Sequence, residues 1–568
     1  MPTPQGWLAD TQATVVDGMN RGREPELISE QQAHMLRNVS IRGGRVRSRP
    51  RIVRRATLPD GFMQGACVFR ANGKVIVGLH GRIYELDTAT WERAELTGAD
   101  INSFKQPRIW TCETSGSLVI QDNQSRPFIY DGAKFRRAAK DEVPIGGAMA
   151  YANGRLAVAS GTGVQLGDIR QTEHQSELKF TETNNLLGGG EFSFGTPVRS
   201  LAALPVIDTG SGQGALIVGC DNAVFTLKTQ ITQRDLWSEV GFQTVLLPTR
   251  GITGANAAVA VNQDLYFRSS DGLRSVRTST ADYNAPGLAP LSVEVRHRFD
   301  YDTPSLLQDA SVVLFDNRLL CTHSPFVYMG RALYQGIVAF NFDGLSGRGQ
   351  KSPPAFDGEW DGVVIAQIFS GLVKGTERCF ILGRDIAGAN SLFEVLPETA
   401  DQVGDEPAQV FESRTLFGDS PGTLKNLRRC DVQFSDIRGG IAVRVYFKPA
   451  KYPYWVKWDE FSVNAPPQQQ WGRVVAQNRT LLSTRSPIED VDPSTGRLIS
   501  CSTGFQVRVE WDGLARLDYL QLFQERVSML PYADNPAASQ QTDVVTVPSW
   551  AESPAFWYAQ PVSPLAGT

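Results

Sequence analysis

ANGKVIVGLHGRIYELD, residues 71–87, shows the unit from which much of this chain is built: a small turn, a short apolar strand, a second turn, and a strand ending near an acid. The same order returns in TSGSLVIQDNQSRPFIYDG at 114–132 and in ANGRLAVASGTGVQLGDI at 152–169. Weaker copies lie at 213–229, 261–278, 315–343 and 375–398. The copies start roughly every 40–60 residues, which is the spacing of propeller blades.

Composition supports an all-β fold. The 568 residues include 53 glycines and 32 prolines, and only 20% are charged. Turns need Gly and Pro for their backbone angles, and a chain with many turns and few long helical patterns is typical of all-β proteins. We therefore expect an irregular β-propeller of roughly six to eight blades over residues 59–400, one of them completed by a strand from elsewhere in the chain.

Residues 401–530 have a different sequence pattern from the repeat region before them. An acidic linker at Asp401–Glu412 precedes segments such as IAVRVYF (Ile441–Phe447) and FQVRVEW (Phe505–Trp511), in which polar and apolar residues alternate. A period of two is typical of half-buried strands. This pattern predicts a β-sandwich-like platform domain after the propeller.

Residues 1–58 do not resemble a blade. Ser29 followed by Gln32 is a capping-box pattern and predicts a short helix over Ser29–Asn38. Gly43–Gly44 predicts a hairpin turn between two alternating runs. We therefore expect an N-terminal helix and hairpin segment that docks on the platform or on another protein.

The hairpin segment carries a cluster of arginines, which are Arg42, Arg45, Arg47, Arg49, Arg51, Arg54 and Arg55. Three interpretations stay open. The cluster is a solvated edge strand protected from aggregation, a docking surface for an acidic protein, or a contact for a nucleic-acid backbone. Few aromatic residues are interleaved with the arginines, which argues against a platform for single strands.

Residues 531–568 are rich in Pro, Ser and Gln and cannot form a core alone. The same segment carries aromatic residues. We expect an extended C-terminal arm that docks on a neighbouring subunit or another protein through Trp550, Phe556, Trp557 and Tyr558.

No pattern in the sequence predicts catalysis, a cofactor or a metal site. The five histidines have no metal-ligand spacing, and the seven cysteines are scattered singly. Cysteines in apolar strands are expected to act as small hydrophobes in a reducing compartment. No signal peptide or membrane-spanning run is expected, and a net charge of −4 gives no general attraction to nucleic acid or membrane.

Several stretches in the same order resemble the nozzle proteins of short-tailed bacteriophages, the tail tubular protein B group. They are EQQAHMLRNVSIRGGRVRSRPRIVRR at Glu30–Arg55, the DGLRS-containing Gly251–Arg277, DASVVLFDNRLL at Asp309–Leu320, and two later segments, Arg414–Phe434 and Phe505–Phe523. The resemblance covers most of residues 25–530. Large insertions of the kind that carry host-facing loops are not expected in so compact a chain.

The resemblance implies a β-propeller beside a β-rich platform, in a virion structural protein without enzymatic activity. It implies a ring of six copies below the tail adaptor protein, with double-stranded DNA passing through the ring during genome ejection. Tail-fibre or tail-tip proteins would be further partners. The protein would be assembled in the bacterial host cytoplasm and act in the virion tail.

Two other classes of function remain alternatives. A propeller-type glycan hydrolase or depolymerase would have a central pocket lined by acidic, basic and tyrosine side chains with shifted pKa values. A peptide-binding propeller scaffold would be a monomer with more regular repeats. Missing SxDxGxTW boxes argue against the hydrolase, and the irregular unit lengths argue against the scaffold.

Overall fold

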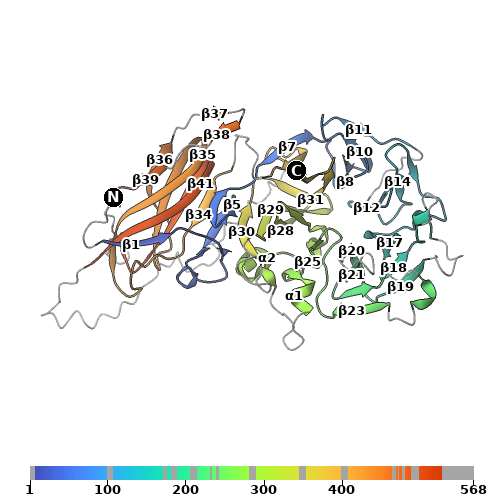
Figure 1. Ribbon diagram of the computed structural model, residues 1–568, viewed down its shortest axis with the longest axis horizontal. Helices are drawn as coiled ribbons and strands as arrows, with labels where there is room; N and C mark the ends of the chain where they lie inside the picture. The colour runs from blue at the N-terminus through green and yellow to red at the C-terminus, as the bar shows by residue number, and fades with distance from the viewer. Residues whose placement is uncertain are drawn as a thin grey trace, which may run out of the picture.

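In the computed structural model the chain forms two lobes that lie side by side, a ring of small sheets and a lobe dominated by two long strands (Figure 1). The structure describes residues 7–98, 106–170, 176–180, 189–204, 214–229, 233–237, 242–280, 290–343, 354–397, 407–463, 468–470, 473–475, 480–487, 491 and 498–527. Trp550, Phe556, Trp557 and Tyr558, the expected contacts of the C-terminal arm, lie outside the described residues.

Five separate antiparallel sheets form blades of a β-propeller arrangement. Their strands follow the chain from one blade to the next. The first blade consists of β8 (Met63–Phe69), β9 (Lys74–Leu79), β10 (Arg82–Leu86) and β11 (Arg93–Glu95). The second blade consists of β12 (Trp110–Glu113), β13 (Leu118–Gln121), β14 (Phe128–Tyr130) and β15 (Phe135–Arg137). The next three are β16 (Met149–Ala152), β17 (Arg155–Ser160), β18 (Gly163–Leu166), β19 (Gly190–Ser193); β20 (Val198–Ala203), β21 (Leu216–Cys220), β22 (Val224–Leu227), β23 (Gln243–Leu247); and β24 (Ala258–Val261), β25 (Asp264–Ser269), β26 (Gly272–Ser275).

Two more four-stranded arrays continue the ring but belong to one large mixed sheet. The first array is β27 (Val312–Phe315), β28 (Arg318–Tyr328), β29 (Arg331–Asn341) and β30 (Ala355–Trp360); the second is β31 (Val364–Val373), β32 (Thr376–Arg384), β33 (Asn390–Val395) and β7 (Ile52–Thr57). Among the described residues, first strands lie beside one another in the order β8, β12, β16, β20, β24, β27 and β31, and β31 lies against β8 again.

Strand β7 comes from the N-terminal segment and completes the last array. It pairs antiparallel with β33, so that Thr57 lies opposite Ser391 and Ile52 lies opposite Val395. A strand from elsewhere in the chain therefore completes one blade, as the sequence predicts. Such a strand joins the first and last parts of a closed ring by backbone hydrogen bonds.

Each of the seven repeat copies found in the sequence coincides with the second and third strands of one array, from β9–β10 to β32–β33. Second strands such as β9 and β21 are buried along nearly their whole length. Blades pack face to face, so both faces of these strands need apolar side chains, and a short continuous apolar run results.

The second lobe depends on two long strands, β35 (Lys425–Pro449) and β41 (Phe505–Arg526), which pair along most of their length. The alternating segments expected as separate short strands are parts of these two. The register shifts between Ser435 and Ala442, where Gly513 has φ +100 and an added Cβ would lie 2.6 Å from the Gly440 carbonyl oxygen. Only glycine fits this close approach, which is typical of a bulge that bends a sheet.

Shorter strands extend this lobe. They are β34 (Gln409–Glu412), β36 (Val456–Val463), β39 (Thr480–Ser483) and β40 (Cys501–Ser502), with β37 (Gln468–Gln470) and β38 (Arg473–Val475) as a separate pair. The apolar core of the lobe includes Phe434, Val443, Val509 and Trp511.

The N-terminal residues are part of this lobe. Strand β1 (Trp7–Gln12) pairs with β41, and β4 (Met35–Arg37) pairs with β34. Strand β2 (Gly18–Met19) pairs with β3 (Gln32–Ala33). Strand β5 (Val39–Arg42) pairs with β6 (Arg45–Ser48), and β6 also pairs with β41. The expected hairpin is confirmed, and Gly43 and Gly44 both have positive φ.

The helix expected over Ser29–Asn38 is wrong, because this segment holds β3 and β4 instead. A capping box stabilises a helix end by only about 1 kcal/mol, and a helix of ten residues is marginal alone. Pairing of Met35–Arg37 with β34 supplies backbone hydrogen bonds and burial of Leu36, which together outweigh the local signal.

Helices are few and short in the described residues. They are α1 (Val276–Thr280), α2 (Arg296–Phe299) and the 3₁₀ segments η1 (Pro25–Leu27), η2 (Ser176–Leu178), η3 (Arg234–Leu236), η4 (Leu291–Val295) and η5 (Pro304–Asp309). All seven cysteines have free thiols, and Cys220, Cys321, Cys379 and Cys430 are buried. Burial raises the pKa of the Cys321 thiol to about 12, consistent with its expected role as a small hydrophobe.

Ring closure can be tested at Gly371 on β31, where an added Cβ would lie 2.6 Å from the Cβ of Val68 on β8. The Gly371→Ala variant should lower the free energy of unfolding by about 1–3 kcal/mol, because the first and last arrays must move apart. Urea unfolding followed by tryptophan fluorescence measures this loss. Gly116→Ala is the control, since nothing lies within 4 Å of its added Cβ; equal losses for both variants would contradict close packing at the seam.

Candidate interaction site at the junction of the lobes

The arginine cluster of the N-terminal segment lies where the two lobes meet, and most of its members contact the chain itself. Arg45 donates to the carbonyl oxygens of Ala13 and Asp518. Arg49 is buried and donates to the carbonyl oxygen of Asp361 at 3.2 Å. Neither residue is a solvated edge-strand charge, so that interpretation fails for this part of the cluster.

Arg54 and Arg55 contact the last array of the ring. Arg54 pairs with Asp385 at 2.9 Å and stays about half exposed. Arg55 pairs with Glu394 at 2.6 Å and lies over the ring of Trp91, with 5.6 Å from the guanidinium carbon to the ring centroid. These arginines therefore help to hold β7 on the propeller.

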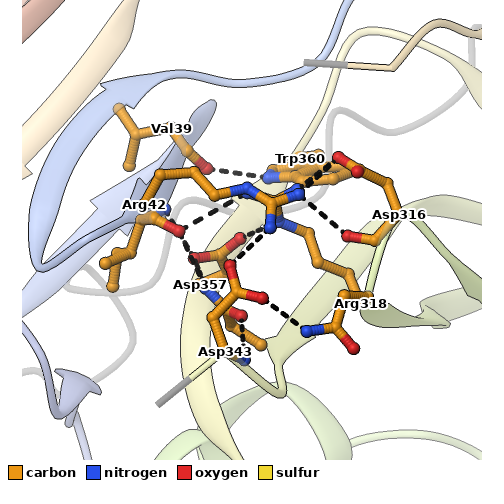
Figure 2. A network of polar contacts seen from close by, with 10 residues as sticks. Val39, Arg42, Asp316, Arg318, Asp343, Asp357 and Trp360 are labelled. Carbon is orange, nitrogen blue, oxygen red and sulfur yellow. Dashed lines mark hydrogen bonds and ion pairs between the residues drawn. The ribbon is translucent and has the colours of Figure 1, made fainter. Parts of the chain in front are cut away.

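Arg42 enters a partly buried polar network between the lobes, where Arg42, Asp316, Arg318, Asp343 and Asp357 converge (Figure 2). Arg42 pairs with Asp316 at 2.6 Å and with Asp343. Arg318 is 1% exposed and pairs with Asp316 at 2.8 Å and with the fully buried Asp357. Each buried charge thus has an opposite partner, which burial requires.

Backbone groups of the N-terminal hairpin complete this network (Figure 2). The Ile41 amide donates to Asp357 at 2.6 Å, and the indole of Trp360 donates to the Val39 carbonyl oxygen at 2.8 Å. Strand β5 is therefore held against β30 by polar contacts as well as by packing. The network acts as a joint, with Asp357 fully buried and Asp316 and Asp343 partly exposed.

A second buried carboxylate, Glu359, holds α2 to β30. It accepts hydrogen bonds from His297 at 2.9 Å and Arg298 at 2.6 Å. Burial alone would raise the pKa of Glu359, but these two partners outweigh burial and hold its pKa well below the ordinary value. A carboxylate kept ionised and doubly paired is a structural anchor, not a general acid.

An ion pair joins the turns that lead into β12 and β27, two first strands on different sides of the ring. Arg108, in the turn entering β12, donates to Asp309 at 2.8 Å, and Asp309 ends the turn that leads to β27. Arg331 lies beside them and donates to the carbonyl oxygens of Met63 at 2.8 Å and Ala366 at 3.0 Å. The ends at which first strands begin meet at one face of a propeller, so this cluster ties opposite sides of the ring together.

A buried cluster in the last part of the ring combines a neutral histidine with an ion pair. Burial lowers the pKa of His323 to about 4, and its Nδ1 lies 2.9 Å from the Ser324 hydroxyl. Nearby, Asp302 pairs with the buried Arg268 at 2.8 Å, while burial raises the pKa of Asp302 to about 6. The two groups therefore respond to acid in opposite directions.

Within the described residues no group of three or more His, Cys, Asp or Glu side chains is placed to hold a metal ion. No helix in the same parts of the chain is both long and apolar enough to cross a membrane. Asp309, Asp316, Asp343 and Asp357 each contact an arginine. Of these arginines, sequence reasoning singled out Arg42 but neither Arg108 nor Arg318, and it singled out none of the four acids.

Comparisons with known proteins find similarity of fold only. No family model and no curated protein matches the chain. Similar solved structures include the mitotic checkpoint complex, with 12% identity, a TM-score of 0.36, and coverage of 61% of this chain and 92% of that one. PorZ of Porphyromonas gingivalis, a surface component of the type-IX secretion system, is 15% identical, with a TM-score of 0.36 and coverage of 65% of this chain and 44% of that one.

The β-propeller domain of Cps50 (Swd1) from Myceliophteria thermophila is 11% identical, with a TM-score of 0.35 and coverage of 61% of this chain and 100% of that domain. At such low scores these similarities support no functional inference. The β-propeller arrangement of this chain follows from its own strand pairings.

The buried joint predicts a contrast between two arginines. Arg318→Gln should lower the free energy of unfolding by about 3–5 kcal/mol, because it leaves the fully buried Asp357 without its charge partner. Arg54→Gln removes a half-exposed pair and should cost at most about 1 kcal/mol. Denaturant unfolding of both variants measures the difference, and similar losses would show that the network does not hold the lobes.

Acid sensitivity should depend on His323. Its folded pKa lies below its unfolded value, so the unfolded chain binds more protons between pH 6.5 and about 4, and stability falls as pH falls through this window. Asp302, with its raised pKa, opposes this loss. His323→Gln should therefore reduce the loss of stability between pH 7 and 4.5 by up to about 3 kcal/mol.

Unfolding midpoints measured at both pH values test this prediction. His80→Gln is the control, since His80 is exposed. An unchanged pH dependence in His323→Gln would show that His323 is not held neutral.

Proposed function

We propose that the protein is a virion structural protein, a subunit of a ring-shaped tail nozzle that connects to a tail adaptor and surrounds the path of double-stranded DNA during genome ejection. In this proposal six copies form the ring, and each copy contributes a seven-bladed propeller and a sandwich-like platform. Tail-fibre or tail-tip proteins would bind its outer surface, and the protein would be assembled in the bacterial host cytoplasm.

One observation carries the proposal: the propeller and the platform are joined as one body. Strands β6 and β7 belong to different lobes, and only Arg49, Pro50 and Arg51 separate them. The buried network around Arg318 and Asp357 reinforces the same joint. A subunit that holds a ring together under load needs such a fixed joint more than it needs a reactive pocket.

The spanned axis supports the same proposal. Because Arg108 and Asp309 tie opposite sides of the propeller, DNA would pass through the opening between subunits and not through the propeller itself. The sequence resemblance over residues 25–530 is the reason that we propose a tail nozzle in particular. The expected C-terminal contacts with a neighbouring subunit remain part of this proposal.

The hydrolase alternative needs free carboxylates at the propeller axis. Asp309 is engaged by Arg108 and receives a hydrogen bond from the Ala332 amide at 3.0 Å. A carboxylate held by these contacts is less able to reach a substrate, which general acid–base catalysis requires. The structure therefore offers less support for this alternative than for the ring subunit.

The proposal is tested by the assembly state of the purified full chain. We expect cryo-electron microscopy to show a ring with six-fold symmetry and mass photometry to show a species of six times 62.3 kDa. A monomer at every concentration that hydrolyses capsular polysaccharide would overturn the proposal in favour of the enzyme. A monomer that binds peptides without forming rings would favour the scaffold.

A further inference from the structure

Strand β36 forms an edge of the platform, on the side of that lobe away from the propeller (Figure 1). Among the described residues it pairs with β35 alone, through Ile441–Phe447. The backbone of Arg485 lies beside it and contacts the side chains of Trp458 and Asp459. The outer backbone groups of an edge strand are a template on which another strand can pair.

The apolar side chains of β36 are only half covered. They pack against the core of the platform, yet each stays partly exposed; they are Val456, Trp458, Phe461 and Val463. One further strand on this edge would bury them more completely and extend the core. The edge therefore offers apolar surface as well as backbone hydrogen-bonding groups.

The loop that leads into β36 adds aromatic and basic side chains to the same edge. Tyr454 is 38% exposed and packs edge to face against Tyr452, with 5.9 Å between the ring centroids. Trp455 is half-buried beside them, and Lys451 is exposed. Aromatic rings and a lysine in this arrangement suit a segment that carries an aromatic residue and an acid.

The C-terminal segment of the chain has a sequence that matches this edge. Residues 528–568 follow β41, lie outside the described residues, and contain three acids but no Lys or Arg. Within them Asp543–Val547 (DVVTV) is a run of β-branched residues after one acid, a composition typical of strands. Pro548 follows the run, and Trp550 and Glu552 come next.

We propose that the β36 edge of one copy receives Asp543–Val547 of a neighbouring copy as an added antiparallel strand. Main-chain hydrogen bonds would hold the donated strand, and its alternate valines would cover the half-buried residues of β36. The occupant is thus a second copy of this chain, and the contact uses a segment whose order of residues follows the order of features on the edge.

The direction of the added strand brings its flanking residues to the loop. An antiparallel partner of β36 runs from the Val463 end toward the Val456 end. Residues after the donated strand therefore continue along the loop before β36. Trp550 comes to lie beside Tyr454, and Glu552 approaches Lys451.

A neighbouring copy is the donor because the chain carries both halves of the contact. A donor segment and an acceptor edge on one chain form a heterologous contact, which repeats from copy to copy and can close into a ring. Residues 528–542 link β41 to the donated strand and span about 50 Å when extended, enough to cross to a neighbour. The inference rests on the proposed function, since it names one contact of the proposed ring.

The first experiment is photocross-linking of the full chain with p-benzoylphenylalanine in place of Trp550. Irradiation should join two chains into a product of twice the chain mass on a denaturing gel, and peptide mapping should place the new bond within residues 450–463. The same photoreactive residue in place of Tyr532 is the control and should not react with that stretch. A bond within one chain, a bond to another stretch, or no bond would overturn the inference.

The second experiment follows hydrogen–deuterium exchange of β36 in the full chain. Val545→Pro should speed exchange of the β36 amides by about tenfold or more, because proline removes a backbone donor and breaks strand pairing. Val562→Pro is the matched control, since it makes the same change in the same segment beyond the donated strand. Both positions lie beyond β41, so neither change touches the strands of the platform.

Mass photometry of the same samples separates this inference from the proposed function. A ring in which Val545→Pro and Val562→Pro exchange alike at β36 overturns the inference and leaves the ring standing. Monomers in which only Val545→Pro speeds exchange show that the segment pairs within its own chain, which overturns the neighbouring donor. Monomers with rapid exchange at β36 in the unaltered chain overturn both the inference and the ring.

Discussion

The architecture depends on the short link between β6 and β7. Strand β6 pairs with β41 in the platform, and β7 pairs with β33 in the last array of the propeller. Three residues, Arg49–Arg51, separate the two strands, so the lobes have little freedom to move apart. Both pairings also join the N-terminus to strands that come more than 300 residues later. Such long-range pairing must overcome a large loss of chain entropy, and it is expected to form late in folding.

Buried charge shapes the joint. Arginines of the N-terminal segment and of β28 meet aspartates from three separate parts of the chain, and β5 contributes backbone groups to the same network. Buried ion pairs add little net stability over apolar packing, but removing one partner is costly. Their value here lies in specificity, since only one arrangement of the lobes pairs all of these charges.

In the proposed function, the propeller and the joint serve a mechanical role. Asp309 contacts Arg108, and the carboxylates of the joint contact Arg42 and Arg318. A site for general acid–base chemistry needs a group whose pKa lies near the working pH and which can reach a substrate. The charged groups of the joint instead fix the positions of the parts of the chain that they connect.

The sequence by itself determined the repeating unit. All seven copies became the second and third strands of an array, because a strand buried on both faces must be continuously apolar and its hairpin turns need Gly, Asn or Asp. The turn at Gly43–Gly44 was predictable for the same local reason. Only the tertiary structure decided that Ser29–Asn38 forms strands, that Ile441–Phe447 and Phe505–Trp511 are parts of two much longer strands, and which acid each arginine meets. These outcomes depend on partners hundreds of residues away, and a local pattern carries no information about the burial and hydrogen bonds that such partners supply.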